Sequence, residues 1–140
     1  MVYNMRRNFT MDDKEMKAML IEYMGKGFLE NIISLLKQDH TLCRFVADML
    51  GDENLRVRLG ATALVEELVE DHREDLRAAV PGIIKLLKHE NPTIRGDAAS
   101  VLGMIKDPTA IDALLACLQD DHPGVREAAQ DALLEMERKV

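Results

Sequence analysis

One helix pattern occurs three times in this chain, and the repetition limits the folds that the sequence can adopt. The three stretches begin at Arg58, Arg95 and Arg126 and read RLGATALVEEL, RGDAASVLGMI and REAAQDALLEM. The first two arginines are 37 positions apart and the last two are 31 apart. Small or apolar residues recur three, six, seven and ten positions after each arginine, which is the spacing of one buried helix face. The pattern predicts a stack of similar helices.

A shorter amphipathic segment precedes each of these helices, as in VPGIIKLLKHENP and AIDALLACLQDDHP. Each unit is therefore predicted to be a pair of antiparallel helices. Such a pair cannot bury its apolar faces alone, so stacked units share a continuous core. The predicted fold is all-α, an α-solenoid of about eight helices. We expect first helices at 41–50, 74–88 and 108–119, and second helices at 54–70, 92–106 and 123–138.

Capping residues mark where several of these helices begin. Asn91 precedes Pro92, and Asp107 precedes Pro108. Asn and Asp side chains accept hydrogen bonds from the first free N–H groups of a helix, and Pro at the first helical position loses no bond. Pro81 is the exception, because it falls inside the first helix of the longer unit. A kink or a late helix start is expected there.

The N-terminal part departs from the repeat pattern. Residues 12–38 contain two amphipathic segments that are predicted to form an atypical capping pair, and residues 1–11 are expected to be flexible. One domain is predicted over 12–140. Six of the nine methionines fall within residues 1–24. Because flexible Met side chains suit adaptable contacts, this region is also a candidate surface for self-association. The predicted repeats span 41–70, 74–106 and 108–138.

Composition excludes several classes of function. The chain has 140 residues, with 25 acidic and 18 basic side chains, for a net charge of −7. This acidity argues against nucleic-acid binding, which needs a positive surface. No apolar run is long enough to span a membrane, and the N-terminus lacks a secretory signal. Cys43 and Cys117 are isolated, as in proteins of a reducing compartment. A cytoplasmic location is expected, with no membrane partner.

The repeats also resemble a known family. The clearest matches to the pattern D-x-x-P-x-V-R-x-x-A-A-x-x-L are DDHPGVREAAQDAL and HENPTIRGDAASVLG, and DENLRVRLGATAL follows with Leu55 in place of Pro. This pattern resembles the HEAT-like repeats of the phycobilisome-lyase type, over about residues 41–138. The resemblance implies an α-solenoid that supplies binding surfaces. It also implies that the arginine opening each repeat bonds a neighbouring turn, and so makes Arg58, Arg95 and Arg126 structural positions.

Helical angles place one line of residues opposite the apolar face of the second helices. In HEAT-like stacks this line tends to face the concave surface. Its middle is nearly bare of side chains, and its flanks are acidic. Bare backbone permits close approach of a partner, although small residues can also simply relieve crowding between helices. The candidate binding residues are Glu66, Glu70, Gly96, Ser100, Gly103, Glu127 and Asp131.

The remaining residues show no pattern typical of a catalytic or metal-binding site. No Gly-rich phosphate loop and no nucleophile–base constellation can be read from the sequence. Iron-binding HEAT-like proteins that resemble deoxyhypusine hydroxylase carry paired His-Glu motifs, but only His89-Glu90 matches here. One such pair cannot supply a two-metal site. We therefore expect no enzyme activity, no cofactor and no metal, and His40, His72 and His122 have no predicted ligand role.

These observations predict a non-catalytic protein–protein interaction scaffold that binds a partner on its concave face. The acidic flanks favour a basic partner. The acidic run at 66–75 is either a solvated turn or part of the docking surface. Two alternatives stay open at this point. The chain could be a lyase-like or chaperone subunit of a larger enzyme, or it could be a structural module that associates with itself as a homo-oligomer.

Overall fold

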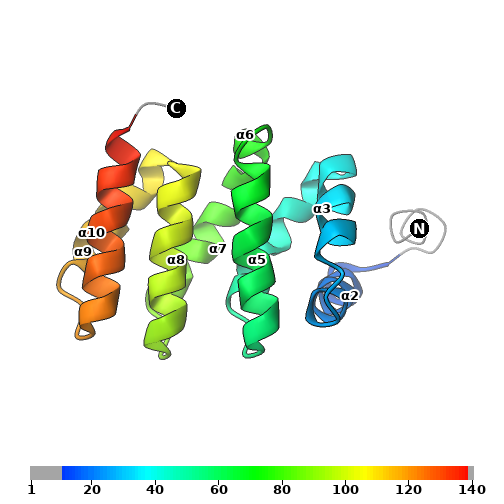
Figure 1. Ribbon diagram of the computed structural model, residues 1–140, viewed down its shortest axis with the longest axis horizontal. Coiled ribbons are helices and arrows are strands. Elements are labelled where there is room, and N and C mark those ends of the chain that lie inside the picture. Colours follow the sequence, from blue (N-terminus) through cyan, green and yellow to red (C-terminus); the bar gives the residue numbers. More distant parts are fainter. Residues whose placement is uncertain (1–10, 139–140) are drawn as a thin grey trace.

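A computed structural model describes residues 11–138, which contain helices and no strand. The helices lie in two layers (Figure 1). Three long second helices form one layer: α5 (Leu55–Leu68), α8 (Pro92–Ile105) and α10 (Pro123–Glu137). The other layer contains their shorter partners: α4 (Val46–Leu50), α7 (Val80–Leu86) and α9 (Ile111–Cys117). The predicted all-α solenoid of stacked helix pairs is confirmed.

The first helix of each unit begins with a tight 3-10 turn that leads directly into the α-helix. These turns are η1 (His40–Phe45), η2 (Arg77–Ala79) and η3 (Pro108–Ala110). When each turn is counted with the α-helix that follows it, and the contiguous run at 73–86 is counted as one, the described residues form eight helical segments. The predicted helix starts also hold: the side chain of Asn91 accepts a hydrogen bond from the N–H of Thr93 at 2.9 Å, and Asp107 does the same for Thr109.

The longer unit differs from the next one by one extra helical turn. The connection after α5 has four residues, 69–72, whereas the connection after α8 has two, 106–107. The helix α6 (Arg73–Leu76) then supplies four more residues, which have no counterpart before η3. Together these additions account for the difference between spacings of 37 and 31. Pro81 lies in the first turn of α7, so the expected late helix start is confirmed.

The described region begins with α2 (Asp13–Gly25) and α3 (Leu29–Gln38), which pack against α5. Asp12 and Glu15 form a reciprocal capping box at the start of α2, with bonds of 2.8 and 3.2 Å. The inner face of α2 is a row of buried side chains at every fourth position: Met16, Leu20 and Met24. Residues 1–10 of the segment predicted to be flexible lie outside the described residues, and so do two of the six N-terminal methionines, Met1 and Met5.

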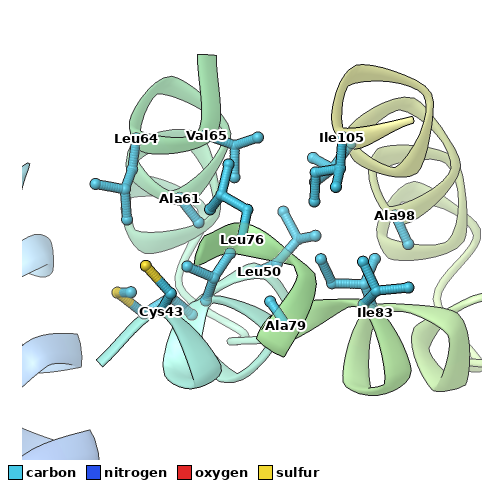
Figure 2. Packing of buried hydrophobic residues seen from close by; sticks show 14 of the residues in the cluster. Cys43, Leu50, Ala61, Leu64, Val65, Leu76, Ala79, Ile83, Ala98 and Ile105 are labelled. Atoms are coloured by element: carbon cyan, nitrogen blue, oxygen red, sulfur yellow. The ribbon is translucent and has the colours of Figure 1, made fainter. Parts of the chain in front are cut away.

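One continuous hydrophobic cluster runs from α2 to α10 between the two layers. Figure 2 shows how side chains from α5 and α8 meet those from the first-helix layer. The alanine three positions after each repeat arginine is fully buried, so the helices approach closely along the whole stack. These residues are Ala61, Ala98 and Ala129, each 0% exposed. The core packs against one side of the second helices, so their other side is available as a surface.

Candidate interaction face

The three repeat arginines lie at one edge of the stack and bind the turns between helices. In each case Nη1 donates hydrogen bonds to the carbonyl oxygens six and five residues earlier, at 2.7 to 3.2 Å. The guanidinium groups of Arg58, Arg95 and Arg126 therefore hold the turn within their own units. Their Nη1 groups are occupied by backbone and do not form part of the candidate binding face.

Arg95 also connects its unit to the next one. Its Nε lies 2.9 Å from Oδ2 of Asp120, and its Nη2 lies 3.0 Å from Oδ1. The hydrogen bond from Arg95 holds the pKa of Asp120 below its usual range, and the bond to the carboxylate raises the pKa of Arg95. A bidentate pair of this kind fixes both position and orientation.

The sequence-predicted binding residues do not all lie in the same environment. Most are exposed on the outer side of the layer formed by α5, α8 and α10. This outer side is the second-helix face. Gly96 is half-buried, and a Cβ added there would meet no atom within 4 Å. Gly103, by contrast, is buried beneath α10. The exposed members of the set are Glu66, Glu70, Ser100, Glu127 and Asp131.

Gly103 is the point where α8 and α10 come closest. A Cβ added at Gly103 would lie 2.8 Å from the Cα of Ala132 and 2.9 Å from its Cβ. Real Cβ atoms do not approach so closely, so this glycine allows the two helices to touch. The bare stretch predicted on α8 is therefore shorter than expected. It covers Gly96 and Ser100, whereas Gly103 relieves crowding against the next helix.

A pocket opens on the second-helix face between α8 and α10. Its volume is about 360 Å³, and it includes three of the seven predicted binding residues. The carboxylate of Glu135 pairs with Arg138 at 3.3 Å, while Leu134 is 55% exposed. The lining residues, which define the α8–α10 pocket, are Ser100, Gly103, Met104, Ala128, Asp131, Ala132, Leu134, Glu135 and Arg138.

Six of these nine lining residues were not among the predicted binding residues. Met104, Ala128 and Glu135 lie next to the predicted line, on the sides of α8 and α10 that face each other. Each follows a residue of that line by one position, so its side chain is rotated by about 100° around the helix axis. These three residues line the pocket because α8 and α10 lie close together. The close packing at Gly103 determines that distance. The spacing of small residues was the one signal in the sequence for this approach.

The carboxylates of the second-helix face are available for a partner. Within residues 11–138, none of the acids at Glu66, Glu70, Glu127 and Asp131 takes part in an ion pair. The ion pairs between units, such as Arg95 with Asp120, lie at the turns instead. The face therefore presents negative charge that is not neutralised by its own neighbours.

The buried ionisable groups of the described region do not form a reactive site. Burial raises the pKa of the Cys43 thiol to about 12 and also raises that of Cys117, so both stay protonated. Burial likewise raises the pKa of Asp97, although the nearby Arg58 opposes that shift. A protonated, buried thiol is a poor nucleophile. These groups give no support for covalent catalysis.

The structure thus defines an α-solenoid with an acidic, pocketed face. The family model for HEAT repeats matches residues 48–134, which is more than half of the chain, and the chain belongs to this family. The match includes α5, α8 and most of α10 and leaves the N-terminal pair outside. It does not distinguish the phycobilisome-lyase type from other HEAT repeats. HEAT repeats commonly mediate protein–protein interaction.

No curated protein matches this chain. No described helix has both the length and the apolar character needed to cross a membrane.

Proposed function

We propose that the chain is a non-catalytic scaffold whose second-helix face is the concave surface and binds a basic segment of a protein partner. The observation that carries the proposal is the α8–α10 pocket, because its small and apolar lining lies beside the carboxylate of Asp131, and its other carboxylate, Glu135, pairs with Arg138. Ser100 and the backbone at Gly103 lie in the pocket, and Asp131 contributes a carboxylate without an ion pair among the described residues. A Lys or Arg side chain fits such a site.

Apolar contacts on the same face would supply the rest of the binding energy. Leu59 is 62% exposed on α5, and Leu134 is 55% exposed on α10. By helical angle, Leu59 and Leu134 both lie opposite the buried apolar face of their helices. A few well-packed residues near the centre of an interface contribute most of its affinity. The proposed partner segment is therefore amphipathic, with apolar residues between its basic ones.

The charge of the face would act on association more than on final affinity. Glu66 and Glu70 near the end of α5, and Glu127 on α10, place acids to both sides of the bare stretch on α8. Such a field steers a basic partner toward the face, and salt screens it. Binding should therefore weaken, and association should slow, as the ionic strength rises.

The remaining predictions from the sequence stay hypotheses. These are the cytoplasmic location, the likeness to the phycobilisome-lyase type, a lyase-like or chaperone role within a larger enzyme, and self-association through the N-terminal region. No particular observation within the described residues favours one of these over the scaffold role.

Fluorescence anisotropy with a labelled helical peptide of alternating Leu and Lys clusters tests the proposal. The comparison peptide carries Glu in place of every Lys. We expect the chain to bind the Lys peptide and not the Glu peptide. The substitution Ser100→Arg, at an exposed position, should place a long cationic side chain in the α8–α10 pocket and weaken binding by at least about tenfold.

A charge-matched control separates the face from the overall negative charge. The double variant Glu127→Gln with Asp131→Asn removes two charges from the face. The double variant Glu53→Gln with Asp112→Asn removes the same charge from a turn and from the first-helix layer. Only the first pair should weaken peptide binding. An equal loss of peptide binding in both double variants would show non-specific attraction. Unchanged binding in both would refute the proposed face.

A further inference from the structure

Two histidines that are far apart in the sequence meet where α6 packs against η1. His40 opens η1, and His72 is the residue that precedes α6. Their ring centroids are 5.2 Å apart. The Nδ1 atom of each ring lies 3.3 Å from the same carboxylate oxygen, Oδ2 of Asp75. Three potential metal-binding groups thus converge on one point, and their ligand atoms all lie within 4.8 Å of one another.

The two separations from Nδ1 to Oδ2 in this His–Asp cluster suit metal ligands as well as weak hydrogen bonds. Good N–H···O bonds cluster near 2.9–3.0 Å, so two bonds of 3.3 Å to one oxygen would both be long. A tetrahedral zinc ion holds nitrogen and oxygen ligands at about 2.0–2.1 Å. The edge of that tetrahedron is about 3.3–3.4 Å, which is the separation observed between each Nδ1 and Oδ2.

The extra turn of the longer unit is what creates the cluster. His72 lies in the lengthened connection 69–72, and Asp75 lies in α6, which has no counterpart in the next unit. At that next boundary the chain reads Asp107-Pro108, and no histidine is present. The cluster is therefore not a by-product of the repeat. It depends on residues added to the repeat at this one boundary.

The cluster lies at the surface, where water can supply a further ligand. The side chains of His40, His72 and Asp75 are 49%, 24% and 28% exposed, so the cluster is held at the surface with one side open to water. Below it, Cys43 and Leu76 belong to the hydrophobic core. Both of these side chains are drawn in Figure 2. The thiol is buried and stays protonated, so it is not expected to be a ligand.

We propose that His40, His72 and Asp75 bind a divalent transition-metal ion, with zinc as the best fit. Two imidazole nitrogens and one carboxylate are a usual zinc ligand set, and water completes the tetrahedron. The ion connects η1 of one unit to α6 of the next and clamps the two units together. Adjacent His-Glu pairs can be read from a sequence, whereas ligands that the fold brings together from two turns cannot, so no metal site was predicted here. This site is independent of the proposed function.

Calorimetric titration of the reduced, full-length chain with zinc chloride tests the proposal. We expect one ion per chain. His40→Ala and Asp75→Asn should each lower the affinity by more than about tenfold, since loss of even a supporting residue costs 10–100-fold. The matched control is His122→Asn, which removes an imidazole but keeps a side chain that can cap α10, where His122 now caps. Zinc affinity should be unchanged in that variant.

Thermal unfolding with and without zinc gives a second readout. A ligand that binds only the folded state raises the melting temperature. Zinc should raise it for the wild type and for His122→Asn, and not for His40→Ala. Because the His40 side chain is half-exposed and contributes little to the hydrophobic core, circular dichroism should show that His40→Ala still folds. Equal zinc affinity in His40→Ala and the wild type would overturn the proposal, as would the absence of binding.

Cobalt substitution distinguishes the ligand set. Co²⁺ in a tetrahedral site of nitrogen and oxygen ligands gives visible d–d absorption bands without a sulfur-to-metal charge-transfer band. We expect this spectrum for the wild type and its loss in Asp75→Asn. A charge-transfer band from thiolate would place the metal on Cys43 or Cys117 and would contradict the assignment to the His–Asp cluster.

Discussion

Arg95 and Asp120 form a two-point ion pair that joins α8 to the turn before α10. The same turn is held from the other side, because the carbonyl of Asp120 accepts a bond from Arg126 at 2.7 Å. One boundary of the stack is thus fixed by side chains of both units. At the preceding boundary the position equivalent to Asp120 is His89, and Nε of Arg58 is buried without a hydrogen-bond partner among the described residues.

The ion pair predicts a pH dependence of stability. Because Arg95 lowers the pKa of Asp120 in the folded state, the pair stabilises the fold above the unfolded pKa of Asp, near about 4. This stabilisation is lost as the pH falls through the folded pKa. Asp120→Asn should therefore lower the melting temperature at neutral pH, and the difference from wild type should shrink in acid. Thermal unfolding across pH measures this, and a constant difference would contradict it.

The two glycines of α8 predict opposite effects of the same substitution. Gly96→Ala adds a methyl group in open space and should stabilise the helix by about 0.5–1 kcal/mol. Gly103→Ala places a Cβ 2.8 Å from Ala132 and should destabilise the protein by about 1–3 kcal/mol. Chemical denaturation of both variants measures the two changes. Stabilisation by both would mean that α8 and α10 are further apart than described.

The fold could be predicted from the sequence because its determinants are local and repeated. Asn91 and Asp107 signal helix starts through their short side chains, and the structure confirms both. Pro81 signals a late start because it lacks an N–H, and it lies in the first turn of α7. These signals need only the residues next to them.

The site could be predicted only in part, because it depends on distances between units. Helical angles placed Ser100 and Asp131 on one face, and both line the α8–α10 pocket. They could not show that Gly103 touches the neighbouring helix. Nor could they bring His40 to His72, since that contact depends on how an inserted turn packs on the preceding unit.

The unpartnered Nε of Arg58 predicts a stabilising substitution. His89 accepts a bond from the N–H of Asn91 at 2.9 Å, and Asp120 accepts the equivalent bond in its own turn at 2.9 Å. His89→Asp should therefore keep the turn and add a carboxylate facing Arg58, as Asp120 faces Arg95. We expect a gain of about 1 kcal/mol. Arg58→Lys combined with His89→Asp is the control, and it should lose most of that gain.

The buried thiol predicts slow chemical modification. Burial raises the pKa of Cys43 to about 12, so the reactive thiolate is scarce in the folded state at mildly alkaline pH. Iodoacetamide should leave Cys43 unmodified in the native protein and should label it after denaturation. Mass spectrometry of digested samples measures both. Rapid labelling of native Cys43 would show that this part of the core opens readily.

The central claim is that the second-helix face is the partner-binding surface, and nuclear magnetic resonance tests it most directly. The measurement is a titration of the ¹⁵N-labelled chain with the Lys-containing peptide. The account predicts that amide shifts concentrate at Ser100, Asp131 and Leu134 and diminish as salt is added. Ile111 and Leu115 offer an alternative, since they are exposed apolar residues on α9. Shifts concentrated there, or no shifts at the α8–α10 pocket, would contradict the claim.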